Sequence, residues 1–239
     1  MNAMTTSTIS ATIFGAIDDH SQPALTFYDD DSGERTELSW ATLGNWAAKT
    51  ANFLVDDQGC LPGDEVLVDL PEHWQTAGIL LGCWWAGAHI RLAGDEPDSP
   101  AVVFTDRTGI DRHPDADEVV VAPLDPFALG FPGLPAGVAD YGSQVRIHGD
   151  HFSGPPYAGA ALDGVAGPEV LGQARSAAAR EAIVAGARVL STREWRSSTG
   201  VVENFLAPLV VGAGLVWVAH PSGDQAARAL TEHAGIVLT

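Results

Sequence analysis

The segment that begins with Leu61 and ends with Gly94 limits the fold more than any other part of the chain. After a Pro-Gly-Asp turn, the run Glu65–Leu70 is short and apolar, which predicts a buried strand. We expect a helix over about Trp74–Ala86, ended by a glycine, and a second strand at Ala88–Leu92. Strand, helix and strand in this order form a βαβ unit, which is the building block of a parallel sheet.

Strands and helices alternate along the rest of the chain as well. An acidic turn at 29–33 lies between a strand at 23–28 and a return strand at 34–38, and its residues predict a β-hairpin over 23–38. Ser39 is the expected N-cap of an amphipathic helix that ends near Val55. Further strands are expected at 101–105, 118–121, 145–148, 189–192, 215–218 and 236–238, and further helices at 168–185, 201–209 (kinked by Pro208) and 224–234.

This alternation predicts an α/β fold, a largely parallel sheet flanked by helices. The chain has 239 residues, of which 46% are apolar and 18% charged, so it is long enough to bury a sizeable core. We expect a single domain over residues 1–239, with sub-lobes at 11–147 and 148–239.

The net charge of −19 argues against binding to nucleic acid or to an anionic membrane surface. No apolar run approaches the roughly 20 residues that span a bilayer, and no basic residue precedes an apolar core at the N-terminus. The expected location is therefore the cytoplasm. Cys60 and Cys83 do not form a metal-binding pair, and free buried thiols are expected.

The order of these features resembles the N-terminal part of the adenylate-forming (AMP-binding) superfamily, which includes the acyl-CoA synthetases. The resemblance is carried by LSWATLGNWAAKTANFLVDDQGCLPGD, by LGCWWAG and by FLAPLVVGAGLVWV, and it is strongest over 23–94 and 205–218. The chain is most similar in kind to an actinobacterial family of truncated AMP-binding-like proteins. The resemblance implies the same α/β fold as the N-terminal domain of acyl-CoA synthetases.

The resemblance also implies a phosphate-binding loop at residues 148–156, in which Ser153 and Gly154 would be the cofactor-binding residues. Such a loop is rich in Ser, Thr and Gly, and it carries a Pro-Lys pair that holds the ATP phosphates. This segment has no threonine and no lysine, and Asp150 would repel a triphosphate. The single lysine of the chain, Lys49, falls on the first long helix, where the family needs none.

Other candidate sites have simpler explanations. His148 and His151, with Asp150 between them, are expected to be loop residues, since a metal site needs further ligands; no metal site is predicted. The Ser-Thr-Gly at 198–200 is expected to start a helix. The glycines at 154–167 predict a flexible loop instead of a dinucleotide site, and the seven tryptophans are expected in the core. No catalytic residue can be named.

Two functions follow. The first is a catalytically inactive remnant, a pseudoenzyme that acts as a binding or partner protein, because no residue in a suitable place could stabilise charge on an α-phosphate. Open sheet edges would then favour a homo-oligomer or a protein partner. The second is an acyl- or nucleotide-binding ligase, with ATP or AMP as cofactor, whose missing half comes from a second chain.

Overall fold

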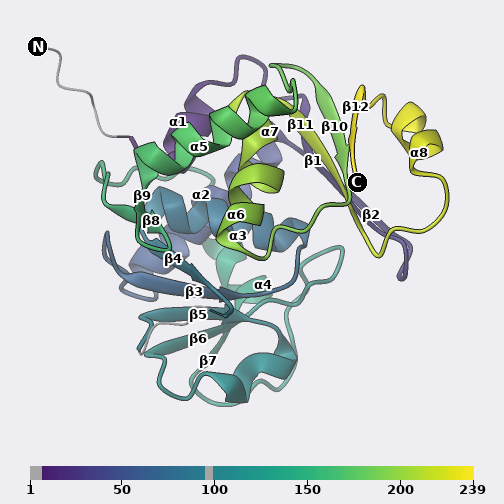
Figure 1. Cartoon of the computed structure of the whole chain (residues 1–239). Helices are drawn as coiled ribbons and strands as arrows, with labels where there is room; N and C mark the ends of the chain where they lie inside the picture. The colour runs from purple at the N-terminus through teal and green to yellow at the C-terminus, as the bar shows by residue number, and fades with distance from the viewer. Residues whose placement is uncertain (1–6, 95–98) are drawn as a thin grey trace, which may run out of the picture.

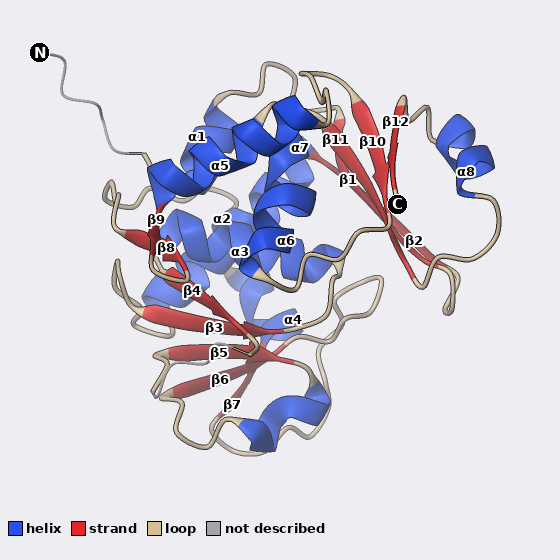
Figure 2. Ribbon diagram, in the orientation of Figure 1, coloured by secondary structure: helices blue, strands red, loops and turns tan. Residues whose placement is uncertain are grey.

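The computed structural model of the chain describes residues 7–94 and 99–239. It contains two sheets, one of seven strands and one of five, with helices packed between them (Figure 1). The helical layer lies in the middle and the sheets lie on either side of it (Figure 2). The α/β fold expected from the sequence is therefore confirmed, and the strands form two sheets.

The seven-stranded sheet contains the predicted βαβ unit, in which β3 and β4 pair in parallel with Val66 opposite Ile90. β8 and β9 form the sheet's antiparallel pair, and its other pairings are parallel. The strand order is β7 (Val138–Asp140), β6 (Glu118–Val121), β5 (Val102–Thr105), β3 (Glu65–Asp69), β4 (His89–Leu92), β8 (Ala160–Leu162) and β9 (Val165–Ala166).

The five-stranded sheet combines the predicted N-terminal hairpin with three strands from the C-terminal part of the chain. The hairpin strands β1 and β2 pair antiparallel, and β1 pairs in parallel with β11. The strand order is β12 (Ile236–Leu238), β10 (Arg188–Ser191), β11 (Gly214–Ala219), β1 (Pro23–Asp29) and β2 (Glu34–Ser39). The predicted sub-lobes at 11–147 and 148–239 do not coincide with this division between sheets, and they stay a prediction.

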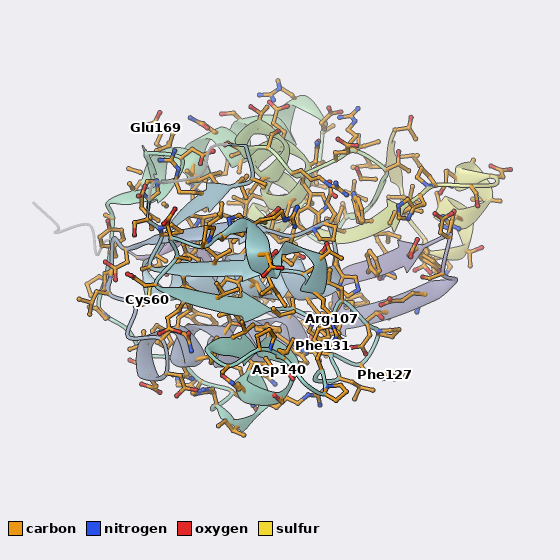
Figure 3. All side chains as sticks on the ribbon, turned by 90° about the horizontal axis from the view of Figure 1, so that it is seen from below. Cys60, Arg107, Phe127, Phe131, Asp140 and Glu169 are labelled. Carbon is orange, nitrogen blue, oxygen red and sulfur yellow. The ribbon has the colours of Figure 1, made fainter. Side chains whose placement is uncertain are left out.

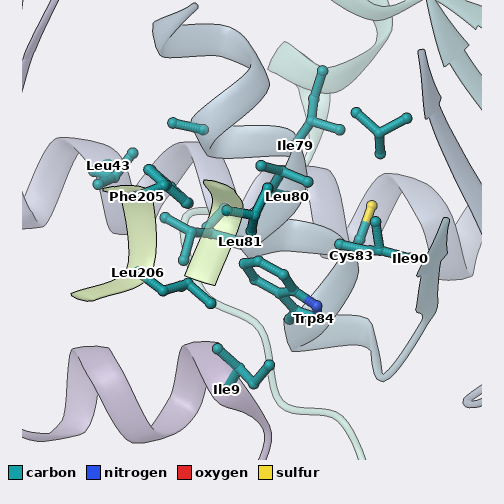
Figure 4. Close-up of a cluster of buried hydrophobic side chains, with 14 of the residues drawn as sticks. Ile9, Leu43, Ile79, Leu80, Leu81, Cys83, Trp84, Ile90, Phe205 and Leu206 are labelled. Carbon is teal, nitrogen blue, oxygen red and sulfur yellow. The ribbon is translucent and has the colours of Figure 1, made fainter. Parts of the chain in front are cut away.

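Helix α3 (Trp74–Ala86) lies at the centre of the molecule, and every residue in it except Trp85 is buried. A helix that is apolar on all sides belongs in a core, where it can pack against neighbours in every direction. Its neighbours include α1 (Ile9–Gly15) and α2 (Trp40–Asp56), which Ser39 caps as predicted. Figure 4 shows Leu81 and Trp84 of this helix next to Ile9, Phe205 and Leu206. One continuous core thus joins both sheets.

A second set of helices connects the two sheets. Helix α5 (Gly167–Arg180) precedes β10, and α6 (Ser198–Gly200), η3 (Val201–Leu206) and α7 (Ala207–Val210) follow it as one run. η3 is a π-helix that ends two residues before Pro208, whose missing N–H cannot bond the carbonyl of Asn204. A π-helix thus lies in the segment where a kink at Pro208 was predicted, and the kink itself stays a prediction. Helix α8 (Gln225–Thr231) leads to β12.

The strand expected at Val145–His148 is wrong. Tyr141–Gln144 forms one turn of helix, α4, and Val145–Ile147 forms a 3₁₀ turn, η2, while η1 (Arg107–Arg112) is a second 3₁₀ segment. The Asp140 side chain caps α4, and Tyr141 and Val145, four residues apart, are both buried on one side of the turn. The helical spacing of these two anchors outweighs the strand-like composition.

The segment before β7 is tied to that edge of the seven-stranded sheet. Asp140 on β7 accepts a hydrogen bond from the backbone N–H of Phe131 at 2.8 Å. The guanidinium of Arg107 lies over the Phe131 ring, 5.5 Å from its centroid. Figure 3 shows Arg107, Phe131 and Asp140 on this side of the molecule, with Phe127 nearby.

Candidate ligand-binding cleft

A cleft of about 300 Å³ lies where β3, β4 and β5 end. The carboxyl ends of parallel strands meet at one edge of a sheet, and ligands of open α/β folds bind outside that edge. About half of the wall is apolar, and the other half is polar, with charged side chains at several points around it. The lining residues are Val68, Asp69, Leu70, Pro71, Glu72, Thr76, Leu80, Leu92, Ala93, Asp106, Arg112, Trp195 and Arg196.

Glu72 connects the two sides of this cleft. Its carboxylate is 2% exposed, and it lies just before α3. It accepts a hydrogen bond from the backbone N–H of Trp195 at 3.0 Å and another from Nε of Arg196. The bond to Glu72 raises the pKa of the Arg196 guanidinium. The buried carboxylate therefore holds the loop between β10 and α6 over the cleft.

The other charged groups of the cleft are also paired. Asp69 follows the core of β3 and contacts Nε2 of His113 at 2.9 Å and a terminal nitrogen of Arg112 at 3.1 Å. Asp106 caps η1 by accepting from the backbone N–H groups of Thr108 and Gly109. The side chains of Arg112 and Arg196 are more than half exposed at the mouth, and a guanidinium has five N–H donors, so each can offer donors to a ligand.

The predicted phosphate loop lies elsewhere and does not line this cleft. Ser153 and Gly154 are both exposed, in a segment without regular structure. The side chain of Asn52 donates to the carbonyl oxygens of Gly149 and His151, both at 3.0 Å. Phosphate is bound by N–H donors, and here the loop directs carbonyl oxygens toward the neighbouring helix.

Lys49 also holds this loop, which the sequence did not predict. Its Nζ donates to the carbonyl oxygen of His148 and lies 2.9 Å from a carboxylate oxygen of Asp150. The single lysine is therefore brought to the loop by the packing of α2, and its charge is paired with the acidic residue. A phosphate bound here would have to displace Asp150 from that contact.

The histidines and cysteines that were considered as possible metal ligands have structural roles or face solvent. Nε2 of His148 lies 2.9 Å from a carboxylate oxygen of Asp57, and His151 is exposed. Among the described residues, no group of three or more His, Cys, Asp or Glu side chains is arranged to hold a metal ion. Cys60 and Cys83 are free and buried, as predicted, and burial raises the pKa of Cys60 to about 12.

The structure also bears on the predicted helix start at residues 198–200 and on the predicted burial of the tryptophans. The helix starts at Ser198 as expected, but its cap is Ser197, whose hydroxyl accepts from the N–H of Gly200 at 3.2 Å. Trp195 is buried, stacks on Phe205 and also lines the cleft. It therefore serves both the core and the candidate site.

Sequence reasoning missed Asp69, Glu72 and Asp106 as cleft residues. A usable pattern was present, because all three lie at or just after the carboxyl ends of strand runs of a predicted parallel sheet. No sequence pattern indicated the contact between Glu72 and Arg196, because 124 positions separate the two residues.

Chemically, the cleft is suited to binding. Its apolar wall can hold a carbon skeleton, and the paired carboxylates and guanidinium groups at its mouth can bond a polar group.

Among the helices in the part of the chain that the structure describes, none is both long and apolar enough to cross a membrane.

Comparison with known proteins agrees with this architecture. No family model matches the chain. A TIGR03089 family protein of Mycobacterium tuberculosis is 43% identical over 209 residues, which cover 83% of this chain and 84% of that protein.

Solved structures of adenylate-forming enzymes share the fold. An acyl-CoA synthetase of Brucella canis superposes with a TM-score of 0.73 at 18% identity, over 97% of this chain and 46% of its own. An anthranilate CoA ligase in complex with anthranoyl-AMP has a TM-score of 0.69 at 13% identity, over 95% and 48%. A benzoate CoA ligase of Burkholderia xenovorans has a TM-score of 0.64 at 17% identity, also over 95% and 48%. The chain thus spans slightly less than half the length of these enzymes.

Proposed function

The chain belongs to the TIGR03089 family and has an acyl-CoA synthetase-like fold, and from this we propose that it is a binding protein that does not form adenylates. In this proposal the cleft at the ends of β3, β4 and β5 holds a small molecule. The protein is then a pseudoenzyme in the sense that it keeps the fold and has lost the reaction.

The observation that carries this proposal is the arrangement of residues 148–156. The loop turns carbonyl oxygens toward Lys49 and Asn52, and Asp150 occupies the ammonium group that would otherwise be free for a phosphate. Adenylation needs positive charge and N–H donors at the α-phosphate, where negative charge develops during acyl attack. In this loop the positive charge of Lys49 is already paired with the carboxylate of Asp150.

The proposed ligand is a small carboxylic acid or an acyl derivative of one. Two proteins that share the fold are described as ligases of benzoate and of anthranilate. An aromatic acid of this size fits the apolar wall formed by Leu80, Leu92 and Trp195. Its carboxylate would lie at the mouth, near the exposed donors of Arg112 and Arg196.

Thermal unfolding with benzoate, anthranilate, anthranoyl-AMP and Mg-ATP tests the proposal. A ligand at 100 times its dissociation constant stabilises the fold by about 2.7 kcal/mol, which raises the unfolding temperature by roughly 5–11 °C for a chain of this size. We expect a shift with the acids and none with Mg-ATP. The variant Trp195→Ala should abolish the shift, whereas Leu230→Ala, at an exposed position on α8, should keep it. A shift with Mg-ATP alone would overturn the proposal.

The alternative is a ligase completed by a second chain, and one finding favours it. The synthetases that share the fold are about twice as long as the matched region. A second polypeptide could therefore supply the remaining half, and the edge strands β12 and β2 are places where it could pack. Mg-ATP binding would support this alternative. Light scattering tests the related proposal of a homo-oligomer or partner complex, and a monodisperse monomer in the purified protein would count against the homo-oligomer.

A further inference from the structure

His89, at the start of β4, makes an unusual contact with the turn between β8 and β9. Its Nε2 accepts a hydrogen bond from the backbone N–H of Gly164 at 2.7 Å. The backbone N–H of Asp163 donates to the carbonyl oxygen of Ile90 at 3.0 Å, so two successive N–H groups fix this turn on β4. Asp163 and Gly164 both have positive φ, at 43° and 80°, and a non-glycine residue keeps such a conformation only when its surroundings hold it.

The contact determines the protonation state of the ring. Because Nε2 accepts a hydrogen bond, it carries no proton, and the proton of the neutral imidazole sits on Nδ1. Nδ1 faces a carboxylate oxygen of Glu65 at 3.5 Å. If Nε2 gained a proton, two donors would face each other at 2.7 Å and the bond to Gly164 would be lost.

The turn that His89 holds is connected to the cleft. The carboxylate of Asp163 accepts a hydrogen bond from the hydroxyl of Ser198, the first residue of α6. Ser198 lies three residues after Trp195 and two after Arg196, which form the cleft wall on this side. Glu72 holds this loop from one side of the cleft, and Asp163 holds its end from the other.

We propose that His89 is a pH-dependent positioning residue for the cleft. The neutral ring fixes the Asp163–Gly164 turn, the turn fixes Ser198, and protonation of the ring releases both and loosens the Trp195–Arg196 loop. The proposal rests on the proposed function only in its last step, which is that this loop contacts a bound ligand.

Three charged side chains surround the imidazole ring of His89. Glu65 on β3 and Asp163 on the turn favour the protonated form, and Arg91 on β4 disfavours it. Burial has the largest effect, and it lowers the pKa of His89 below its ordinary value of 6.5. A folded-state pKa below the unfolded value means that the neutral form is favoured by the fold. The stabilisation is therefore present above pH 6.5 and is lost as the pH falls through the folded-state pKa.

An NMR titration of the ligand-free protein from pH 7.5 to pH 5 tests the proposal. The His89 ring, the Gly164 amide and the Trp195 indole N–H should shift together, with one midpoint below pH 6.5. In His89→Gln, a side-chain carbonyl can accept the Gly164 N–H without titrating, so the shifts of Gly164 and Trp195 should disappear. In the matched control His20→Gln, which replaces an exposed histidine, they should persist.

The proposal is wrong if His89 titrates while Gly164 and Trp195 stay unchanged, or if their shifts survive in His89→Gln. The wild-type titration decides the first point even if the variant does not fold. Benzoate affinity is then measured separately at pH 7.5 and at a pH below the midpoint. We expect it to weaken by about threefold to tenfold in the wild type, equivalent to one net hydrogen bond, and not in His89→Gln. Absence of benzoate binding at both pH values would refute the proposed ligand and leave the titration result standing.

Discussion

The two sheets of this protein are assembled in different ways. The seven-stranded sheet takes all its strands from one continuous stretch, residues 65–166, in which β3, α3 and β4 form a local βαβ unit. The five-stranded sheet joins residues 23–39 to residues 188–238, so the paired residues of β1 and β11 are 190 positions apart. Loop closure makes such long-range pairing slow to form. We expect the seven-stranded sheet to form first.

The sheets also differ in what covers them. The inner face of the seven-stranded sheet packs on α3 through apolar side chains. One face of the five-stranded sheet carries a polar network, in which Glu232 accepts from Tyr28, Arg35 and Arg188. Arg35 and Arg228 lie on the Tyr28 ring, 5.5 and 4.6 Å from its centroid. The comparison shows that apolar packing supports the local unit, whereas ion pairs help to join the distant segments.

The largest expected effect comes from removing the side chain at the shared core. Trp84→Ala should destabilise the protein by about 3–5 kcal/mol, because it empties a fully buried site and removes the bond from its Nε1 to the carbonyl of Ala161. Urea unfolding followed by tryptophan fluorescence and by far-UV circular dichroism measures it. Since one core joins the sheets, both probes should give the same midpoint. Separate midpoints would show that the sheets unfold independently.

A matched pair of glycine substitutions compares the central helix α3 with helix α5, which belongs to the set that connects the two sheets. A Cβ at Gly82, on α3, would lie 2.4 Å from Cβ of Thr50 and 2.9 Å from the backbone oxygen of Ala47. Gly82→Ala should therefore destabilise by about 1–3 kcal/mol. A Cβ at Gly172, on α5, meets nothing within 4 Å, so Gly172→Ala should stabilise by about 0.5–1 kcal/mol. Equal effects of the two substitutions in urea unfolding would contradict the close helix packing.

The polar network gives the five-stranded sheet a pH dependence. Burial alone would raise the pKa of Glu232, but the bonds from Tyr28, Arg35 and Arg188 outweigh it and lower the pKa. The stabilisation is thus present above the unfolded pKa of about 4.5 and is lost as the pH falls through the lower folded value. Glu232→Gln should cost about 1–2 kcal/mol at pH 7, allowing for the half-exposed Arg35, and less at pH 3. Thermal unfolding at both pH values measures it, and an equal loss at both would argue against a charge effect.

The substitution with the smallest expected effect on the free energy of unfolding is at Lys49, which lies outside both sheets. Lys49→Met removes the ammonium group that holds Asp150 and the carbonyl of His148, both partly exposed contacts. The free energy of unfolding should fall by less than about 1 kcal/mol. Hydrogen exchange at residues 148–154 should nevertheless rise, while exchange in β3 and β4 stays the same. Unchanged exchange in the loop would show that Lys49 does not hold it.

Much of the secondary structure could be predicted from the sequence, because it depends on neighbours along the chain. Helix α3 has the bounds that were expected, and so do β6 and β12, since turn residues and caps mark their ends. Short strands were harder, because β7, β8 and β9 have at most three residues and carry no clear alternation. The error at Val145–His148 arose because apolar residues four apart also suit a helical turn.

The site could be predicted in part. Asp69 and Asp106 could have been found from their positions at the carboxyl ends of predicted parallel strands. The resemblance to a known family led to Ser153 and Gly154, which the structure leaves exposed. The contacts of Lys49 with His148 and Asp150, 99 and 101 positions away, depend on how α2 packs, which local composition does not encode.

The sequence by itself therefore determined the α/β class, the βαβ unit and the positions of the longer helices, because hydrophobic periodicity and turn chemistry act within a few residues. The tertiary structure decided that the strands form two sheets, that Glu72 meets Arg196, and that His89 holds the turn beside Ser198. Such contacts join residues many positions apart, and their geometry exists only once a shared core has fixed the elements against one another.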